Sequence, residues 1–307
     1  MIRMFANMKK IILFLLLSWL FVFSAIADSA IDYFNVMGEV YFRFENARVF
    51  NMNEISTVVS ISHVKDQWIY AYANQKEFAR FLSLNIPFEM LQHPGYAANV
   101  DSALKFSLTF TLSQYYPTYP EYLAMMQQFA SDYPDICSVY DIGTSVQGRK
   151  ILAVRITGLS DSLFKPKVFL TSTIHGNELT GYAVLLYLID YLVSEYGRNP
   201  VVTEILDRCE IWINPLANPD GTYWAGDDNV FGARRYNANS IDLNRNFPDP
   251  AEGNHPDGNE YQSETISMMN VASTEKFVLS ANFHSGAELV NYPWDTWEKL
   301  HPDNNWF

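Results

Sequence analysis

The sequence predicts an α/β protein, with a mixed, mostly parallel sheet flanked by helices and a small α/β module before it. Two observations predict this class. From about residue 113 onward, apolar runs of strand length alternate with segments of helix length, and a shorter strand-rich stretch precedes them. In addition, 49% of the 307 residues are hydrophobic and 18% are charged, a balance that excludes a disordered chain and supplies a large core.

Residues 1–27 have the pattern of an export signal. Lys9 and Lys10 precede an apolar stretch over residues 11–23, and the small residues Ala25 and Ala27 follow it. The stretch is shorter than the ~20 residues that a membrane-spanning helix needs. We therefore expect cleavage after Ala27 and a secreted or periplasmic protein, with an uncleaved membrane anchor as the alternative.

The net charge of the chain is strongly negative. It is -13 at pH 7, and it becomes -16 without residues 1–27, which contain three cations and no acid. A field of this sign disfavours phosphate backbones and anionic lipid. We expect no nucleic-acid partner, no stable membrane anchor and a monomeric protein.

Cys137 and Cys209 are the two cysteines of the chain. In an exported protein they could form a disulfide, or they could remain as two buried thiols. Their spacing excludes a thiolate zinc site of the usual kind.

Residues 28–105 form the predicted N-terminal module. Strand-like segments cover residues 38–44, 56–64 and 67–73, and a helix-like segment covers residues 74–91. Turn-forming residues then predict a linker, which puts the domain boundary between residues 95 and 112.

Residues 113–307 form the predicted main domain. Its expected elements, in order, are a helix at 116–136, a hairpin at 137–157 with its turn at Gln147 and Gly148, a strand at 166–173, a helix at 178–197, a strand at 209–221, a helix at 262–276 and a strand at 276–284. The run at 166–173 is continuously apolar at its centre, which suits a strand buried on both faces. In such sheets, ligands bind beyond the carboxyl ends of the strands.

Chemically active side chains follow two of these strands. His175 comes directly after the strand at 166–173, and Glu178 lies three residues further on, so both side chains point toward one place. The strand at 276–284 also ends in a histidine, His284. Two histidines and one glutamate leave a tetrahedral zinc ion one open position, which is typical of a catalytic site.

Four motifs carry a resemblance to a known family. They are HGNE at 175–178, NPLANPDG at 214–221, RYNANSIDLNRNFP at 235–248 and LSANFHSGAELVNYPWD at 279–295. In this order they resemble the zinc metallocarboxypeptidases over residues 115–307. The N/E-like branch is the better match, because Asn177 stands where the pancreatic branch carries an arginine. The resemblance implies a carboxypeptidase-like fold that is incomplete at its C-terminus.

The resemblance implies the roles of the metal site. One Zn²⁺ ion would be bound by His175, Glu178 and His284. Asp242 would accept a hydrogen bond from His175 and fix the tautomer of its ring.

The resemblance also implies how a peptide would be held. Arg235 would polarise the scissile carbonyl and hold the oxyanion, and Arg234 could replace it if the register slips. Asn244 and Arg245 would grip the terminal carboxylate, which a planar guanidinium binds through two parallel hydrogen bonds. Asp295 matches the aspartate that recognises a basic last residue in the N/E branch.

The expected function is therefore a zinc-dependent metallocarboxypeptidase that acts on peptide or protein C-termini and prefers Lys or Arg as the last residue. In the family, a general-base glutamate and a tyrosine lie several tens of residues beyond the third zinc ligand. The chain ends at Phe307, 23 residues after His284, and Glu288 is a poor substitute for that base. We expect this chain to bind zinc and to hydrolyse peptides poorly.

Three alternatives remain open at this point. HGNELTG and DLNR also occur in the aspartoacylase and succinylglutamate desuccinylase group, which splits N-acyl amino acids. A chain without the general base could instead be a noncatalytic binder of zinc and peptide C-termini. The N-terminal module loosely resembles carboxypeptidase pro-segments, and a plain accessory domain is the alternative.

Overall fold

A computed structural model of the chain describes residues 33–48, 50–94, 116–160, 164–286, 289–293 and 299–306. These residues form two compact units, one mainly of residues up to Gln92 and one mainly of residues from His93 onward. The expected export signal and the expected linker lie outside the described residues.

The first unit is a four-stranded sheet in the order β2-β3-β1-β4, accompanied by helices. Its elements are β1 (Glu39–Glu45), α2 (Met52–Ser56), β2 (Ser60–Lys65), β3 (Trp68–Asn74), α3 (Gln75–Ser83) and β4 (Phe88–Leu91). Strand β1 pairs antiparallel with both β3 and β4. Its alternate residues Val40, Phe42 and Phe44 are fully buried in one core with Phe78 and Phe81 of α3.

Two predictions for this unit were wrong in their boundaries. The helix expected at 74–91 ends at Ser83, and Phe88–Leu91 form β4 instead. Asn85 takes a left-handed backbone with φ 53°, and Pro87 disfavours helix at the residue before it, so the chain leaves the helix here. The strand expected at 56–64 begins only at Ser60, because α2 ends at Ser56 and a turn covers residues 57–59.

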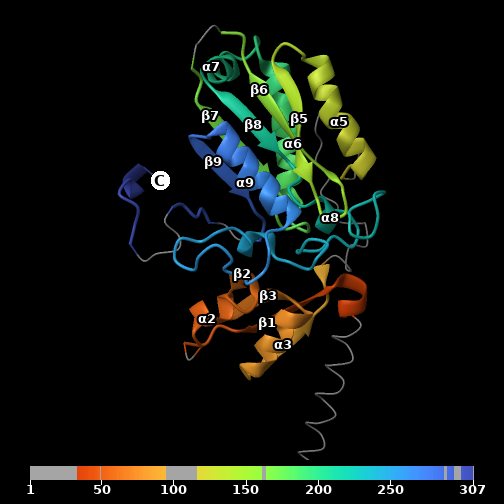
Figure 1. Ribbon diagram of the computed structural model, residues 1–307, viewed down its shortest axis with the longest axis vertical. Helices are drawn as coiled ribbons and strands as arrows, with labels where there is room; N and C mark the ends of the chain where they lie inside the picture. Colours follow the sequence, from red (N-terminus) through yellow and green to blue (C-terminus); the bar gives the residue numbers. More distant parts are fainter. Residues whose placement is uncertain are drawn as a thin grey trace, which may run out of the picture. The chain divides into compact units, whose positions relative to one another are not determined.

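The second unit is built on a five-stranded sheet in the order β5-β6-β8-β7-β9 (Figure 1). Its strands are β5 (Cys137–Thr144), β6 (Lys150–Thr157), β7 (Lys167–Ser172), β8 (Glu210–Asn214) and β9 (Leu279–Phe283). The β5–β6 and β6–β8 pairs are antiparallel, whereas β7 runs parallel to both β8 and β9. The sheet is therefore mixed, and the predicted hairpin joins β5 to β6.

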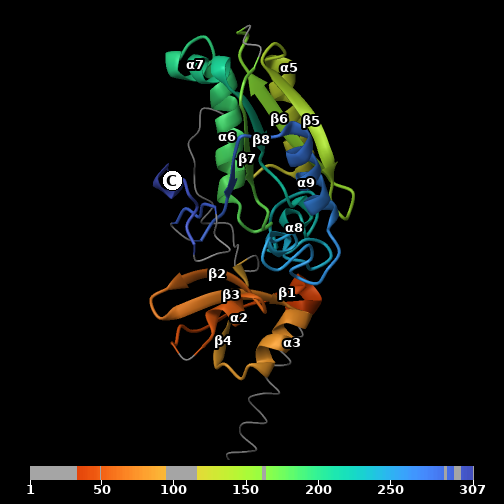
Figure 2. The ribbon, with the colours of Figure 1, turned by 60° about the vertical axis from the view of Figure 1, so that its left-hand side comes forward.

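Helices cover both faces of this sheet (Figures 1 and 2). They are α5 (Tyr119–Asp132), α6 (Thr180–Glu195), α7 (Pro200–Arg208) and α9 (Ser263–Glu275). Alternate side chains of β6 point to opposite faces of the sheet and show which helices cover each face. Leu152, Val154 and Ile156 pack in one core with α5, α6 and α7, while Ile151 and Ala153 pack in a second core with α9. A central strand buried on both faces results.

The segment expected to be a strand at 209–221 differs from the prediction. Strand β8 ends at Asn214, and Pro219–Thr222 form a single helical turn, α8. Pro215 lacks the backbone N–H that would continue the ladder. Helix α7 was not predicted, although Asn199 caps it and Pro200 opens it, which is a typical start signal.

Strand β9 forms an edge of the sheet and all five of its residues are exposed. Apolar side chains are among them, with Leu279 58% exposed. Strand β7 is the neighbour that fixes its position. The segment that leads to His284 is thus held by one ladder of backbone hydrogen bonds.

The two cysteines are free thiols in this structure. Cys137 lies on β5 and Cys209 directly precedes β8, with β6 between these strands. Two interstrand spacings amount to about 10 Å, which is beyond the ~7 Å reach of a disulfide. Burial raises the pKa of the Cys137 thiol to about 12, so this thiol is unreactive.

Among the described residues, no helix combines the length and the apolar character that crossing a bilayer requires.

A buried carboxylate ties the β5–β6 turn to the loop after β8. Asp220 is fully buried and accepts hydrogen bonds from the Ser145 hydroxyl (2.7 Å) and the Gln147 backbone N–H (2.8 Å). The Arg149 guanidinium pairs with the same carboxylate at 2.7 Å and also binds Asp227. One charge therefore fixes two loops of the second unit.

We expect Arg149→Ala to lower the free energy of unfolding by about 2 kcal/mol, because it leaves the Asp220 charge buried with fewer partners. Urea denaturation measures the change. Arg208→Ala is the matched control, since Arg208 pairs with Glu204 at the surface and such pairs contribute under ~1 kcal/mol. Equal effects of the two substitutions would contradict the importance of the buried pair.

Candidate metal centre

The neighbouring side chains of His175 and Glu178 meet the distant His284 beyond the sheet. The Nδ1 atom of His175 lies 2.9 Å from Oε1 of Glu178, and the Nδ1 atom of His284 lies 2.8 Å from its Oε2. One donor atom from each residue lies within 4.8 Å of the others. The group combines two imidazoles and one carboxylate, a ligand set that zinc accepts.

Parallel pairing brings these residues together. His175 follows the carboxyl end of β7, and His284 follows the carboxyl end of β9. The register pairs Ser172 with Phe283, so the two strands end side by side. Glu178 lies at the end of the short loop from β7 to α6 and is 106 residues from His284 in the sequence.

The loop that carries His175 starts from an unusual backbone conformation. Thr173, the first residue after β7, has φ 60° and is fully buried. A β-branched residue rarely adopts this left-handed region, and holding one there costs about 1–3 kcal/mol. The chain turns sharply out of the strand at this residue.

Two glycines of the motifs meet at a point where no side chain fits. A Cβ atom on Gly176 would overlap the backbone of Gly221 and Thr222, and one on Gly221 would overlap the carbonyl of Tyr236. The HGNE and NPDG motifs therefore need glycine because their backbones touch.

Asp242 holds the other side of the His175 ring. Its Oδ1 lies 3.1 Å from Nε2 of His175 and also accepts the Asn244 backbone N–H at 2.9 Å, at the start of the short helix η2 (Leu243–Arg245). Burial alone would raise the pKa of Asp242, but the facing His175 and Arg235 hold it well below its usual range. The carboxylate thus stays charged and fixes the orientation of the ring.

Arg235 is the arginine that reaches this group. Its Nη1 donates to Oε1 of Glu178 at 2.8 Å, and its side chain is almost completely buried. The preceding Arg234 points elsewhere, because its guanidinium stacks on the Trp224 ring and donates to the carbonyl of Asn237. The alternative register with Arg234 in the site is therefore wrong for this structure.

Glu178 is the most heavily shared group of the site. Besides the two histidines and Arg235, its Oε2 accepts the Ser285 backbone N–H at 3.0 Å. Burial by itself would raise the pKa of Glu178, yet the hydrogen bonds from His175 and His284 and the charge of Arg235 lower it. The carboxylate is available in its charged form to a cation.

Asn218 was not among the predicted site residues, although it belongs to the NPDG motif. It is fully buried, and its Nδ2 donates to the carbonyls of Ile174 (3.2 Å) and Arg235 (3.3 Å). Its Oδ1 accepts the Gly221 backbone N–H at 2.9 Å. One side chain therefore joins the histidine loop to the arginine loop.

The predicted peptide-binding residues are only partly described. Asn244 is exposed, and Arg245 is half-buried with its Nη1 donating to the carbonyl of Asn244 at 3.2 Å. Both directly follow Asp242 in the chain, and Asp242 contacts His175. Asp295 and Glu288 lie outside the described residues.

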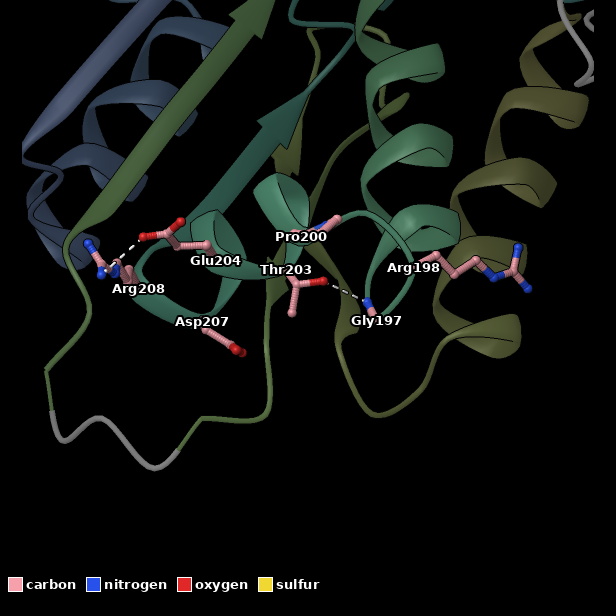
Figure 3. A pocket seen from close by; sticks show the side chains of 7 residues that line it. All are labelled: Gly197, Arg198, Pro200, Thr203, Glu204, Asp207 and Arg208. Atoms are coloured by element: carbon pink, nitrogen blue, oxygen red, sulfur yellow. Dashed lines mark hydrogen bonds and ion pairs between the residues drawn. The ribbon is translucent and has the colours of Figure 1, made fainter.

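A separate depression of about 580 Å³ lies at the turn between α6 and α7 (Figure 3). Its charged side chains include Glu204 and Arg208, which pair with each other at 3.0 Å. Helix α7 ends two residues before the amino end of β8, whereas the histidines follow carboxyl ends of strands. The depression therefore lies near the amino end of β8, away from the carboxyl ends of the strands where the histidines lie.

Comparison with known sequences identifies related proteins. The family model described as zinc carboxypeptidase, Peptidase_M14, matches residues 122–307. Mouse carboxypeptidase M is 40% identical over 175 residues, which are 56% of this chain and 39% of that protein. Rat carboxypeptidase D is 36% identical over 181 residues, which are 58% of this chain and 13% of that protein. Human carboxypeptidase Z is 34% identical over 221 residues, which are 64% of this chain and 34% of that protein.

The chain thus spans less than half the length of the curated relatives it matches. Carboxypeptidases M, D and Z are of the N/E type, so the predicted branch is confirmed.

Solved structures share the fold. Thrombin-activatable fibrinolysis inhibitor aligns with a TM-score of 0.60 and 17% identity, covering 87% of this chain and 76% of its own. Carboxypeptidase A from Helicoverpa armigera aligns with a TM-score of 0.54 and 20% identity, covering 82% and 71%. The predicted α/β class is confirmed by these similarities.

We expect Asn218→Ala to destabilise the protein by about 3 kcal/mol, because it leaves two buried carbonyls and one N–H without their partner. Chemical denaturation with and without the substitution measures this. In Asn244→Ala, which changes an exposed side chain, the free energy of unfolding should move by under ~0.5 kcal/mol. A loss below ~1 kcal/mol for Asn218→Ala would show that Asn218 does not join the loops.

Proposed function

Because the chain belongs to the zinc carboxypeptidase family, we propose that it is a zinc-dependent metallocarboxypeptidase that removes the C-terminal residue of peptides. The observation that carries this proposal is the convergence of His175, Glu178 and His284 next to the buried guanidinium of Arg235. A cation site with an adjacent fixed positive charge suits a reaction in which negative charge develops on a carbonyl oxygen.

A single zinc ion is the proposed cofactor. His175, Glu178 and His284 would hold it, and their donor types fit zinc. When bound, zinc supplies a Lewis acid for the peptide carbonyl and for water. Asp242 keeps a proton on Nε2 of His175, which leaves Nδ1 free to be a ligand.

The remaining polar residues would bind the peptide. Arg235 would stabilise the oxyanion, since its guanidinium is rigidly placed at Glu178. Asn244 and Arg245 would hold the terminal carboxylate; Asn244 is exposed and Arg245 is half-buried, so a peptide end can reach both. Asp295 would select a basic last residue, Lys or Arg.

We also propose where the protein acts. The pattern of residues 1–27 supports export, and the acidic charge supports a secreted or periplasmic monomer whose partners are peptide or protein C-termini. The N-terminal unit would be a pro-segment-like module that precedes the enzyme domain.

Binding without turnover is the second candidate, and one observation favours it. Within the part of the chain that the structure describes, Glu178 and Asp242 are the carboxylates in contact with the histidines and Arg235, and both are already engaged by them. Neither is free to take a proton from water. A general base would have to come from residues other than these two.

Zinc at about 1,000 times its Kd is expected to stabilise the protein by about 4 kcal/mol, because it binds the folded chain alone. The melting temperature should therefore rise with zinc and fall back with a chelator. His284→Ala removes one of the three donors and should abolish most of the rise. His255→Ala, at an exposed histidine outside the group, should keep it. An unchanged rise in His284→Ala would contradict the proposed site.

A peptide that ends in Lys with a free carboxylate should bind the zinc-loaded chain at least ~10-fold more tightly than its C-terminal amide, because the amide cannot accept the paired hydrogen bonds. Arg245→Ala should erase this difference, and the surface variant Arg208→Ala should retain it. Calorimetry measures the affinity, and chromatography shows whether Lys is released. Release supports the peptidase, binding without release supports the second candidate, and equal affinity for acid and amide contradicts both.

A further inference from the structure

Thr173 occupies the point where β7 gives way to the loop that carries His175 and Glu178. It is the one β-branched residue among the non-glycine residues described with a positive φ. Its side chain is fully buried, so its hydroxyl hydrogen-bonds within the protein and not to solvent. A threonine in this conformation needs a reason, because glycine adopts it without strain.

The backbone of Thr173 is held by the segment after β8. The Ser172 carbonyl accepts the Ala217 N–H at 3.1 Å, and the Thr173 carbonyl accepts the Asn218 N–H at 3.0 Å. The two chains thus stay bonded beyond the sheet, and the left-handed turn begins from a fixed base.

The hydroxyl of Thr173 lies between two carbonyls. Its Oγ1 is 3.2 Å from the carbonyl of Pro215, 3.5 Å from the carbonyl of Glu178 and 3.3 Å from Oγ of Ser172. The Pro215 carbonyl already accepts the Ser172 hydroxyl at 2.6 Å, so the proton of Thr173 is available to the Glu178 carbonyl. The same atom therefore touches the end of β8 and the far end of the histidine loop.

This arrangement fixes the distance between the two ligands of the loop. His175 and Glu178 are separated by two residues, and Glu178 has its carbonyl tied back to the start of the loop. The Glu178 backbone N–H also donates to the carbonyl of His175 at 3.0 Å, so the Thr173 hydroxyl adds a second restraint on the backbone of Glu178.

We propose that Thr173 is a positioning residue, whose buried hydroxyl sets Glu178 against His175 and thereby tunes the affinity of the site for zinc. The inference rests on the proposed function, because it assumes that these residues bind the ion. It explains why the chain keeps a strained threonine where glycine would relax the backbone.

Three substitutions separate the hydroxyl from the strain. Thr173→Ser keeps the hydroxyl and should leave the Kd for zinc within about 3-fold. Thr173→Val keeps the shape and the strain without the hydroxyl, and should weaken zinc binding by at least about 10-fold. Thr173→Gly relieves the strain and also lacks the hydroxyl, so it should weaken zinc binding as much as Thr173→Val does, and its zinc-free melting temperature shows that the variant is folded. Competition with a chelator gives the Kd, and calorimetry gives the melting temperature.

Lys276→Gly is the matched control. Lys276 has φ 55° at the C-terminal end of α9 and is exposed, so glycine relieves the same kind of strain away from the ligands. Its zinc affinity should equal that of the unsubstituted chain.

The results separate this inference from the proposed function. Weak zinc binding by Thr173→Val and Thr173→Gly, with normal binding by Thr173→Ser and Lys276→Gly, supports it. Normal zinc binding by Thr173→Gly overturns it and leaves the proposed function intact. Failure of the unsubstituted chain to bind zinc overturns the proposed function and this inference together.

Discussion

The site depends on one constraint, the parallel pairing of β7 with β8 on one side and with β9 on the other. Parallel strands end at the same edge of a sheet, so the residues that follow each of them meet. His175, Asn218 and His284 each come within a few residues after such an end. A different strand order would leave the same motifs in the sequence and separate their side chains.

The charges around Glu178 and His175 determine how the group formed by His175, Glu178 and His284 could bind a cation. A buried carboxylate is costly unless it is paired, and Glu178 has two imidazoles, a guanidinium and a backbone N–H around it. Both ring nitrogens of His175 face carboxylate oxygens, although a neutral imidazole carries one N–H. A cation bound between Nδ1 of His175 and Glu178 would be held by both groups, while Asp242 keeps the other ring nitrogen in place.

The sequence predicts the framework of this protein better than its details. Apolar runs located the five strands of the main sheet and the long helices, because burial on both faces leaves a strong pattern. The four-residue β4 and the nine-residue α7 escaped because short elements carry little periodicity. The motifs named His175, Glu178 and His284, and the structure brings these three side chains together, yet the choice between Arg234 and Arg235 needed the structure. Adjacent residues point in different directions, and the stacking of Arg234 on Trp224 cannot be deduced from their order.

The motifs are specific because their residues constrain one another physically. Gly176 must be glycine because Gly221 lies against it, and Asn218 must reach both Ile174 and Arg235. A substitution at one motif therefore disturbs another that is tens of residues away. The side chains around His175 and the backbone that shapes its loop therefore depend on one another. Asn244, by contrast, has an exposed side chain, and a substitution there leaves these contacts in place. The framework therefore restricts the identity of that side chain less than it restricts Gly176 or Asn218.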